Sequence, residues 1–261
     1  MTGAGNFFQD RKSKGDCLLF SFPCAILDSN IARQPFSGRD IVLELNKIFK
    51  SFGNFPVLKG ASLHCKQGYA LCLAGSNGAG KTTLLSIAAG ICKPDSGTIS
   101  LGGSVGFVPQ NSFLLEDLTI KENLILWYAA CGRRRRDIFQ SGSIESRFGL
   151  KEFASRRIKA LSGGYRKRVE IACALAKSPD YLLMDEPFTA LDLDSRNEIT
   201  ALLGEYRQQG KGILFSSHDP AAIAGAADGI ALLRDGTVVR EETLSDAETR
   251  GAQIMELLMD E

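Results

Sequence analysis

The chain has 261 residues, an apolar share of 44% and a formal net charge of +1 at pH 7. This length suits one large domain or two small ones, and the apolar share can supply a sizeable core. Because the net charge is near zero, the protein as a whole has no electrostatic attraction to nucleic acid or to a membrane surface. No apolar run approaches the roughly 20 residues of a membrane-spanning helix, so any action at a membrane requires another chain to span it.

The first forty residues differ in composition from the rest. Residues 1–16 are polar and glycine-rich, and residues 17–27 form an apolar run behind several basic residues. The run resembles a weak signal sequence, but Asp16 borders it, Pro23 interrupts it and no clear cleavage site follows. We expect residues 1–40 to be a poorly ordered extension or the result of a misassigned start of translation.

Regular patterning begins at Ile41. Residues 41–49 and 57–65 are predicted strands, with Gly53 and Asn54 as the turn between them. Residues 70–74 predict a short buried strand, and residues 82–87 open a helix. The segment between these two elements matches the phosphate-binding pattern G-x-x-x-x-G-K-[ST] at every position. It reads Gly75-Ser76-Asn77-Gly78-Ala79-Gly80-Lys81-Thr82-Thr83.

Each residue type in this loop suits a phosphate chain. The glycines allow the backbone to curl around phosphates and expose its N–H groups. Lys81 can reach the β- and γ-phosphates as a compact charge, and Thr82 offers a hydroxyl to Mg²⁺. The helix N-terminus also favours an anion. The strand–loop–helix context therefore predicts nucleotide binding rather than an inert glycine-rich loop.

Further along the chain, strands and helices alternate. Short strands are predicted at 98–101 and 105–108, and a helix with an apolar face at 120–131. Residues 132–160 are charged and include four consecutive arginines, which we interpret as a solvated loop rather than a lipid or partner contact. The alternation to about residue 239 predicts a parallel sheet covered by helices. Asp235-Gly236 predicts a hairpin turn, and residues 245–259 a last amphipathic helix.

Two adjacent carboxylates end a predicted apolar strand at 181–184. Asp185 and Glu186 are costly at such a place unless they serve a cation or a proton transfer. Asp185 can hold Mg²⁺ through water, as a Walker B aspartate does. Glu186 can act as general base for the water that attacks the γ-phosphate. With a phosphate loop upstream, this interpretation is preferred to a strand that simply runs into a polar loop.

A third motif is Leu161-Ser162-Gly163-Gly164-Tyr165. Ser162 is a candidate N-cap for a helix that continues to Lys177, and the two glycines expose N–H groups at its positive end, which suits another phosphate. Together the three motifs resemble the nucleotide-binding domain of ABC ATPases, over roughly residues 41–240. The resemblance implies a P-loop NTPase fold of mixed α/β class, with a RecA-like parallel-sheet core, an antiparallel β subdomain and a helical subdomain at about 111–177. Residues 241–261 would add a short C-terminal helix.

The resemblance assigns further residues. Gln110 resembles the Q-loop glutamine, which contacts Mg²⁺ and the attacking water, and residues 189–192 resemble the D-loop. His218 resembles the switch histidine that contacts the γ-phosphate, and Phe52 stands where an aromatic usually stacks on adenine, although Phe55 is nearby. Expected catalytic residues are therefore Glu186, His218, Gln110 and Lys81. Nucleotide contacts are expected from residues 75–83, Phe52, Ser162, Gly163 and Gly164, and metal contacts from Thr82, Gln110 and Asp185.

Three positions depart from the family pattern. Tyr165 replaces the signature glutamine, which places one polar contact across the domain interface in doubt. Thr189 stands where serine is commoner. Asp192 is followed by Leu193 and Asp194 rather than the frequent proline. None of these changes removes a phosphate, metal or water ligand, so we expect a working ATPase.

The resemblance also implies partners. ATP and Mg²⁺ would lie between the phosphate loop of one domain and Ser162, Gly163 and Gly164 of a second domain in a homodimer or heterodimer. Residues 118–124 and 127–132 resemble the drug- and sodium-exporter branch, in which this region meets a separate integral-membrane permease. We expect an exporter subunit at the cytoplasmic face of the cell membrane, without a nucleic-acid partner.

Two other classes remain to be weighed. A soluble ABC ATPase is the main alternative: the single domain disfavours a translation factor and the lack of a long insertion disfavours a repair ATPase. An iron–sulfur cluster assembly ATPase is harder to exclude, because residues 166–171 are faintly similar to it. A catalytically inactive binding module is disfavoured, because Lys81, Asp185, Glu186 and His218 are all present.

Overall fold

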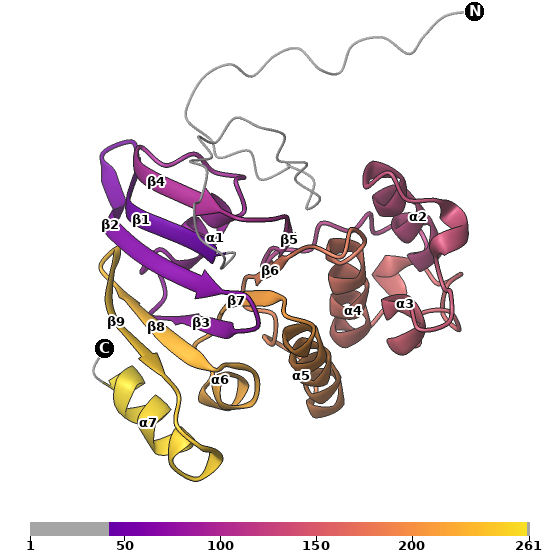
Figure 1. Ribbon diagram of the computed structural model, residues 1–261. Coiled ribbons are helices and arrows are strands. Elements are labelled where there is room, and N and C mark those ends of the chain that lie inside the picture. Colours follow the sequence, from indigo (N-terminus) through magenta and orange to yellow (C-terminus); the bar gives the residue numbers. More distant parts are fainter. Residues whose placement is uncertain (1–41, 260–261) are drawn as a thin grey trace, which may run out of the picture.

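The computed structural model describes residues 42–259, so the expectation for residues 1–40 lies outside it. Two sheets and two groups of helices make up this part of the chain (Figure 1). The chain begins with a hairpin of β1 (Val42–Phe52) and β2 (Phe55–Lys66), and β4 (Ser96–Leu101) adds to the free edge of β1. This three-stranded sheet, with order β2-β1-β4, is antiparallel throughout. It is the antiparallel layer that the family resemblance implied.

The second sheet is the centre of the fold. Its order is β5-β6-β7-β3-β8-β9, and every neighbouring pair is parallel except the last. The strands are β3 (Ala70–Ala74), β5 (Val105–Val108), β6 (Tyr181–Met184), β7 (Gly212–Ser216), β8 (Gly229–Arg234) and β9 (Thr237–Thr243). The predicted parallel sheet is confirmed, with a β8–β9 hairpin that turns at Asp235 and Gly236 as expected.

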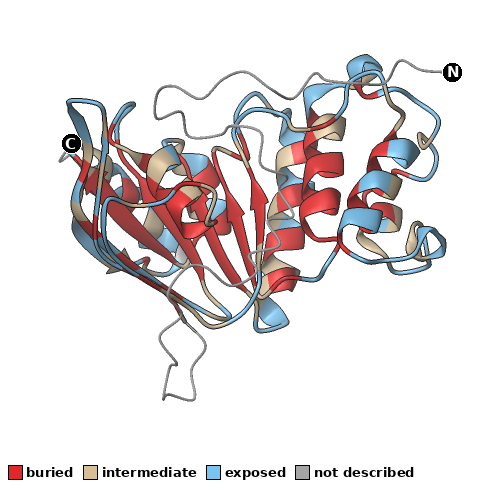
Figure 2. Cartoon of the chain, turned by 90° about the horizontal axis from the view of Figure 1, so that it is seen from above, coloured by how far each residue is buried: buried red, intermediate tan, exposed pale blue. Residues whose placement is uncertain are grey.

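Alternate residues of the buried strands face two different cores, as the period of a strand requires. Leu71, Leu73 and Leu183 pack with α1 (Lys81–Ala88) and the antiparallel sheet. Cys72, Leu182 and Phe215 belong to the core on the opposite face. That core includes residues of α4 (Gly163–Ala174), α5 (Leu193–Gln208), α6 (Pro220–Ala226) and α7 (Ala247–Met259). The central strands are consequently buried along their whole length (Figure 2).

The helical part lies beyond the β5 edge of the sheet and contains α2 (Ile120–Ala130), η1 (Arg135–Asp137), α3 (Ile144–Arg147) and η2 (Ile158–Ala160), with α4 between it and the sheet (Figure 1). Thr119 begins α2 with a reciprocal cap: its hydroxyl accepts from the Glu122 N–H at 3.2 Å, and the Glu122 carboxylate accepts from the Thr119 N–H at 2.8 Å. Such a cap specifies where the helix starts.

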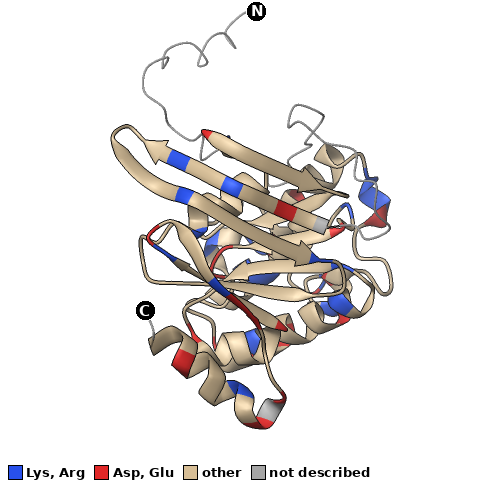
Figure 3. Cartoon of the chain, turned by 60° about the vertical axis from the view of Figure 1, so that its left-hand side comes forward, with Lys and Arg blue, Asp and Glu red and all other residues tan. Residues whose placement is uncertain are grey.

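Several predicted boundaries shift by a few residues. The first hairpin is longer than expected, because β1 continues to Phe52, which pairs with Phe55 across the turn. The helix after Ser162 ends at Ala174 rather than at Lys177, and the last helix begins at Ala247 rather than at Ser245. Within residues 42–259, no helix has the length and apolar character needed to cross a membrane. Basic and acidic residues are interspersed on the surface strands and on α7, as the near-neutral charge implies (Figure 3).

Candidate nucleotide site

The candidate residues gather at one edge of the central sheet. The phosphate loop follows β3, Asp185 and Glu186 follow β6, and His218 comes two residues after β7. These three strands are parallel neighbours in the order β6-β7-β3. Gln110 comes two residues after β5, the strand on the other side of β6. The carboxyl ends of parallel strands meet at the same edge, which is where ligands bind in sheets of this kind.

Glycines shape the phosphate loop where other residues could not fit. A Cβ atom at Gly75 would lie 2.2 Å from the Leu233 carbonyl oxygen, so the loop passes directly against the end of β8. Gly80 has a φ of +107° and packs against Val57 and Leu58 of β2. Both positions require glycine, because both lack space for a side chain and both have a positive φ, which is +148° at Gly75. The loop is thereby held between the two sheets.

The Lys81 side chain bends back across the loop it follows. Its Nζ donates to the carbonyl oxygens of Gly75 at 2.5 Å and Ser76 at 3.0 Å, and the residue is only 7% exposed. These contacts place a buried positive charge inside the curve of the loop, where a phosphate oxygen would replace a carbonyl as acceptor. Thr82 is exposed and Thr83 is half-buried in the first turn of α1.

Asp185 is buried at the end of β6 and has a single hydrogen-bonded oxygen. The Ser216 hydroxyl donates to its Oδ1 at 2.6 Å, and its backbone N–H donates to the Val108 carbonyl at 2.8 Å. Its Oδ2 is buried without a protein partner among the described residues. A buried carboxylate oxygen without a partner destabilises the fold unless a ligand binds to it. The free Oδ2 therefore fits a cation or a water bound to one.

Glu186 and His218 are in contact across the same edge. Nδ1 of His218 lies 2.9 Å from Oε1 of Glu186, and because a carboxylate only accepts, a proton on Nδ1 satisfies the pair. The Thr189 hydroxyl donates to Oε2 of Glu186 at 3.2 Å. Glu186 also has a left-handed backbone, with φ of +48°, and its N–H donates to the Ser216 hydroxyl at 2.8 Å. Two contacts thus hold the carboxylate, and a third holds the backbone of the same residue.

These residues fit magnesium bound to a nucleotide. Among the residues that the structure describes, no group of three or more acidic, histidine or cysteine side chains could enclose a metal by itself. Mg²⁺ usually takes one or two protein ligands together with substrate phosphates and water. Asp185 supplies the unpartnered oxygen and Thr82 an exposed hydroxyl at the start of α1, so the donor set suits such an ion.

Gln110 and Phe52 are the less constrained candidates. Gln110 is exposed directly beyond β5, whose last residue, Val108, bonds to the Asp185 backbone. Phe52 is half-buried at the end of β1 and packs on the same core as Val57, which backs Gly80 of the phosphate loop. Phe55, across the turn, is 78% exposed. Phe52 therefore lies on an element that borders the loop, whereas Gln110 follows β5, which β6 and β7 separate from β3. The roles of Phe52 and Gln110 remain predictions.

The signature residues lie on a different part of the chain. Ser162 caps α4, and its hydroxyl accepts from the Tyr165 N–H at 3.4 Å. Gly163 is exposed, whereas Gly164 is buried where a Cβ atom would lie 2.1 Å from the Ser195 Oγ of α5. Helix α4 stands beside α5 in Figure 1, whereas residues of α1 pack with those of the antiparallel sheet. The structure thus does not bring Ser162, Gly163 and Gly164 to the phosphate loop of the same chain; Gly164 packs against Ser195 of α5 instead.

Tyr165, the departure from the family pattern, has a packing role. Its ring meets Phe153 edge-on at 4.9 Å between centroids, and the Arg168 guanidinium lies 4.7 Å from its centroid. Arg168 continues the contact to α5, where it bonds to the Ser195 hydroxyl at 3.3 Å and pairs with Glu198 at 2.8 Å. The Ser195 hydroxyl donates to Asp192 of the D-loop at 3.1 Å. A continuous chain of contacts therefore links the signature to the D-loop.

Two sets of residues escaped the sequence reasoning. Ser216 holds both carboxylate residues, and its only signal was a small hydroxyl at the end of a strand next to β6. Arg168 and Ser195 connect the signature to Asp192 of the predicted D-loop, and nothing in their spacing pointed to this connection. Each contact depends on the packing of segments distant in sequence.

Comparison with known proteins shows the family of this chain. The family model described as ABC transporter matches residues 58–189. The chain is 31% identical over 218 residues to the linearmycin resistance ATP-binding protein of Bacillus subtilis (strain 168), covering 78% of this chain and 70% of that protein. It is 32% identical over 214 residues to an Fe(3+) ions import ATP-binding protein of Rhodococcus jostii (strain RHA1), covering 76% of this chain and 61% of that protein.

A solved structure gives the same answer at the level of the fold. The dimeric structure of a bacterial ABC transporter cassette superposes with a TM-score of 0.69 at 28% identity, covering 78% of this chain and 99% of that chain. The family match and the relatives show the family, and the solved structure shows the fold. The chain is a member of the ABC transporter family, as an ATP-binding cassette that hydrolyses ATP.

Proposed function

We propose that this ATPase drives a separate membrane permease through ATP-dependent pairing with a second ATPase domain, and that it serves export. The observation that carries the proposed pairing is that Ser162 and Gly163 are exposed at the start of α4, away from the phosphate loop of their own chain. Hydrolysis within this proposal rests on the fixed position of Glu186. Its carboxylate touches His218 and Thr189 while its neighbour Asp185 keeps one buried oxygen without a partner. Glu186 can thereby act as a general base and Asp185 as a metal ligand. Hydrolysis of a phosphoanhydride requires both functions.

The protein groups would divide the chemistry as follows. Residues 75–83 bind the phosphates through backbone N–H groups, and Lys81 exchanges its carbonyl partners for β- and γ-phosphate oxygens. Glu186 orients and deprotonates the attacking water. His218 holds Glu186 in its orientation and would contact the γ-phosphate. Phe52 stacks on adenine, and Gln110 contacts the water and the metal.

Mg²⁺ is proposed as the metal, held by Thr82, Asp185 and Gln110 together with water and phosphate. When bound, it neutralises charge on the β- and γ-phosphates. The chain contributes the buried Oδ2 of Asp185, which Ser216 orients by binding the other oxygen. Because Ser216 also binds the Glu186 N–H, metal ligand and base share one support.

Pairing with a second domain is supported by the location of the signature. Ser162 and Gly163 are exposed at the N-terminus of α4, a helix end that favours an anion, and they lie on the helical part of the chain rather than at its phosphate loop. A second domain would bring its own Ser162, Gly163 and Gly164 to this chain's ATP. The relative of known structure is described as dimeric, which favours the same arrangement here.

Export is proposed from the likeness of residues 118–124 and 127–132 to exporter subunits and from the resistance protein among the relatives. The import protein among the relatives favours the opposite direction. A peripheral position at the cytoplasmic face of the membrane follows if a permease is the partner. The alternative, a soluble ABC ATPase such as an iron–sulfur cluster assembly ATPase, would have a partner without membrane spans.

Two measurements test this proposal. The Glu186→Gln variant with Mg·ATP should sediment as a dimer and return to a monomer when ATP is replaced by ADP, while Lys81→Ala should remain monomeric with either nucleotide. The tagged chain purified from membranes should then carry a protein with several apolar spans. A monomer that hydrolyses ATP at the full rate, or a partner without membrane spans, would contradict the proposal; reconstitution in vesicles decides the direction of transport.

A further inference from the structure

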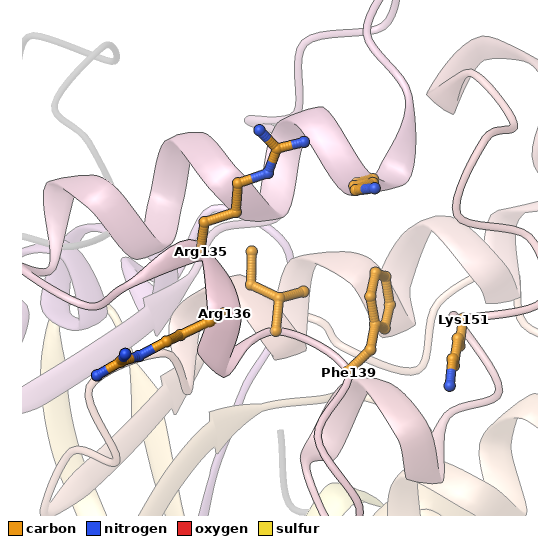
Figure 4. Close-up of a pocket in the computed structure, with 6 residues that line it drawn as sticks. Arg135, Arg136, Phe139 and Lys151 are labelled. Carbon is orange, nitrogen blue, oxygen red and sulfur yellow. The ribbon is translucent and has the colours of Figure 1, made fainter.

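A basic cavity lies in the helical part of the chain, outside the residues assigned to ATP. It has a volume of about 610 Å³ and is lined by Lys121, Arg135, Arg136, Ile138, Phe139 and Lys151. These residues come from three places: the first turn of α2, the η1 segment with the loop after it, and the loop that follows α3. A volume of this size suits a small molecule or a large headgroup. Figure 4 shows Phe139 standing between Arg135 and Lys151, with Arg136 extending to the opposite side.

No carboxylate offsets the positive charge of this cavity. All its charged lining residues are basic, and none of them forms an ion pair within residues 42–259. The acidic residues beside them in sequence are used elsewhere or do not line the cavity: Glu122 caps α2, and Asp137 accepts from the Arg134 N–H at 3.1 Å. Glu152, next to Lys151, is not part of the lining. Like charges grouped in this way repel until an anion joins them.

The four consecutive arginines have different surroundings. Arg133 donates to the Ala176 carbonyl at 2.7 Å and stacks on Tyr128 at 5.1 Å, so it fastens the loop to the core. Arg134 lies outside the lining, whereas Arg135 and Arg136 belong to it. All four arginines are exposed, as expected for a solvated loop, and Arg135 and Arg136 also line the cavity.

The cavity also has an apolar side. Ile138 and Phe139 are half-buried and pack on the main core, so they are fixed rather than loose. Phe139 has a left-handed backbone with φ of +61°, which a bulky aromatic rarely adopts. The surrounding structure must hold the ring in place at this cost. Cations placed around a fixed aromatic ring match an anion attached to an apolar group.

We propose that this cavity binds a phosphate monoester that carries an apolar chain. Lys121, Arg135 and Lys151 would bind the phosphate oxygens, and Ile138 and Phe139 would contact the chain. The ligand can be a lipid headgroup in a bilayer or a soluble phosphate ester, because both present this chemistry. The site is separate from the proposed coupling to a permease and does not depend on it.

Binding is tested with the full chain after the ATP site has been saturated with Mg·ADP. Calorimetry with hexyl phosphate and with inorganic phosphate measures the soluble ligand, and co-sedimentation with phosphatidylcholine vesicles, with and without phosphatidic acid, measures the lipid. The pocket variant is Arg135→Gln/Lys151→Gln. Its control, Arg134→Gln/Lys93→Gln, removes the same charge from exposed residues outside the lining.

The pocket variant should lose about tenfold or more in affinity for the probe that binds, because each charge-assisted hydrogen bond contributes strongly, while the control stays within roughly twofold. Phe139→Asn, which tolerates the left-handed backbone, should weaken hexyl phosphate but not inorganic phosphate. Circular dichroism and ATPase rate verify that each variant is folded.

The two probes identify the source of the ligand. If the wild type sediments with phosphatidic acid vesicles and the pocket variant does not, the ligand is a lipid headgroup. If the wild type binds hexyl phosphate but not the vesicles, the ligand is a soluble ester. The proposal is overturned if neither probe binds, or if the pocket variant binds the probe as tightly as the wild type does. It is also overturned if the control variant loses as much affinity as the pocket variant. An intact ATPase rate in either case separates this outcome from a failure of the proposed function.

Discussion

Nδ1 of His218 lies 2.9 Å from Oε1 of Glu186, although β7 and β6 deliver the two residues from positions more than thirty apart in the chain. His218 is exposed, whereas the Glu186 side chain is 10% exposed. The histidine therefore covers the carboxylate on its solvent side, and the hydroxyl of Thr189 binds its second oxygen. This arrangement holds the proposed base in place before substrate arrives.

Replacing Glu186 with glutamine should separate binding from hydrolysis. The amide keeps the size of the side chain but cannot accept a proton, so the ATPase rate should fall about 10²–10⁴-fold while the affinity for Mg·ATP stays near that of the wild type. Steady-state phosphate release and equilibrium nucleotide binding measure the two effects. His218→Ala should reduce the rate less, because it removes an orienting contact and leaves the base. Glu186→Gln retaining more than a tenth of the rate would rule out the assigned role.

Ser216 should be important for both stability and turnover. Its hydroxyl donates to Asp185 at 2.6 Å and accepts from the Glu186 N–H at 2.8 Å, and all of these groups are at least partly buried. Ser216→Ala leaves a buried carboxylate and a buried N–H without partners, so the free energy of unfolding should fall by about 1–3 kcal/mol. The turnover number should fall as well.

The matched control for Ser216 is the adjacent Ser217→Ala. Ser217 is also buried, but its hydroxyl accepts from the Asp219 N–H at 3.1 Å and touches neither carboxylate. Urea unfolding gives the stability change and phosphate release gives the rate. Equal losses of turnover in the two variants would show that the Asp185 contact has no special function.

The sequence predicted the central sheet and the residues at its edge because each rests on a local signal. The phosphate loop follows the pattern residue by residue, and buried strands ending in carboxylates or histidine need only a short window to be noticed. Parallel order then follows from the alternation of strands and helices, and it brings the strand ends together. These signals required no knowledge of which strand neighbours which.

The contacts of Ser216 and Arg168 could not be predicted in this way. Ser216 reaches Asp185 because β6 and β7 are adjacent in register, with Met184 opposite Phe215. Arg168 reaches Ser195 because α4 packs on α5. Nor does the sequence indicate that Glu186 adopts a left-handed backbone, since this conformation is imposed on a non-glycine residue by its surroundings. Tertiary packing determines all three.

Gly164 should tolerate no side chain. A Cβ atom there would lie 2.1 Å from Oγ and 2.8 Å from Cβ of Ser195, so Gly164→Ala must push α4 away from α5. We expect a loss of about 1–3 kcal/mol in the free energy of unfolding, as for other overpacked sites. Turnover should also fall, since the displaced helix carries the signature.

The control for this prediction lies in α5 itself. A Cβ atom at Gly204 meets nothing within 4 Å, so Gly204→Ala should stabilise the chain by about 0.5–1 kcal/mol through helix propensity alone. The double variant Gly164→Ala/Ser195→Gly removes the clash and should recover part of the stability. Thermal and urea unfolding of the three variants measure the effects. An unchanged stability of Gly164→Ala would mean that α4 and α5 are not packed as described.

Asp180 should contribute stability that is lost in acid. Burial by itself would raise the pKa of this carboxyl, but hydrogen bonds from Lys211 Nζ at 2.9 Å and from the N–H and hydroxyl of Ser104, each at 2.9 Å, outweigh it and lower the pKa below its usual 3.8. A carboxyl whose folded pKa is lowered stabilises the fold above its unfolded pKa. This contribution disappears as the pH falls through the lowered value.

The difference in free energy of unfolding between the wild type and Asp180→Asn should therefore be largest near neutral pH and shrink below roughly pH 4. Urea unfolding at a series of pH values measures it. Lys211→Gln should reproduce part of the same pH dependence, because it removes the first of the hydrogen bonds that favour the charged carboxylate. A difference that stays constant from neutral pH into acid would show that the carboxylate form is not what holds residues 104, 180 and 211 together.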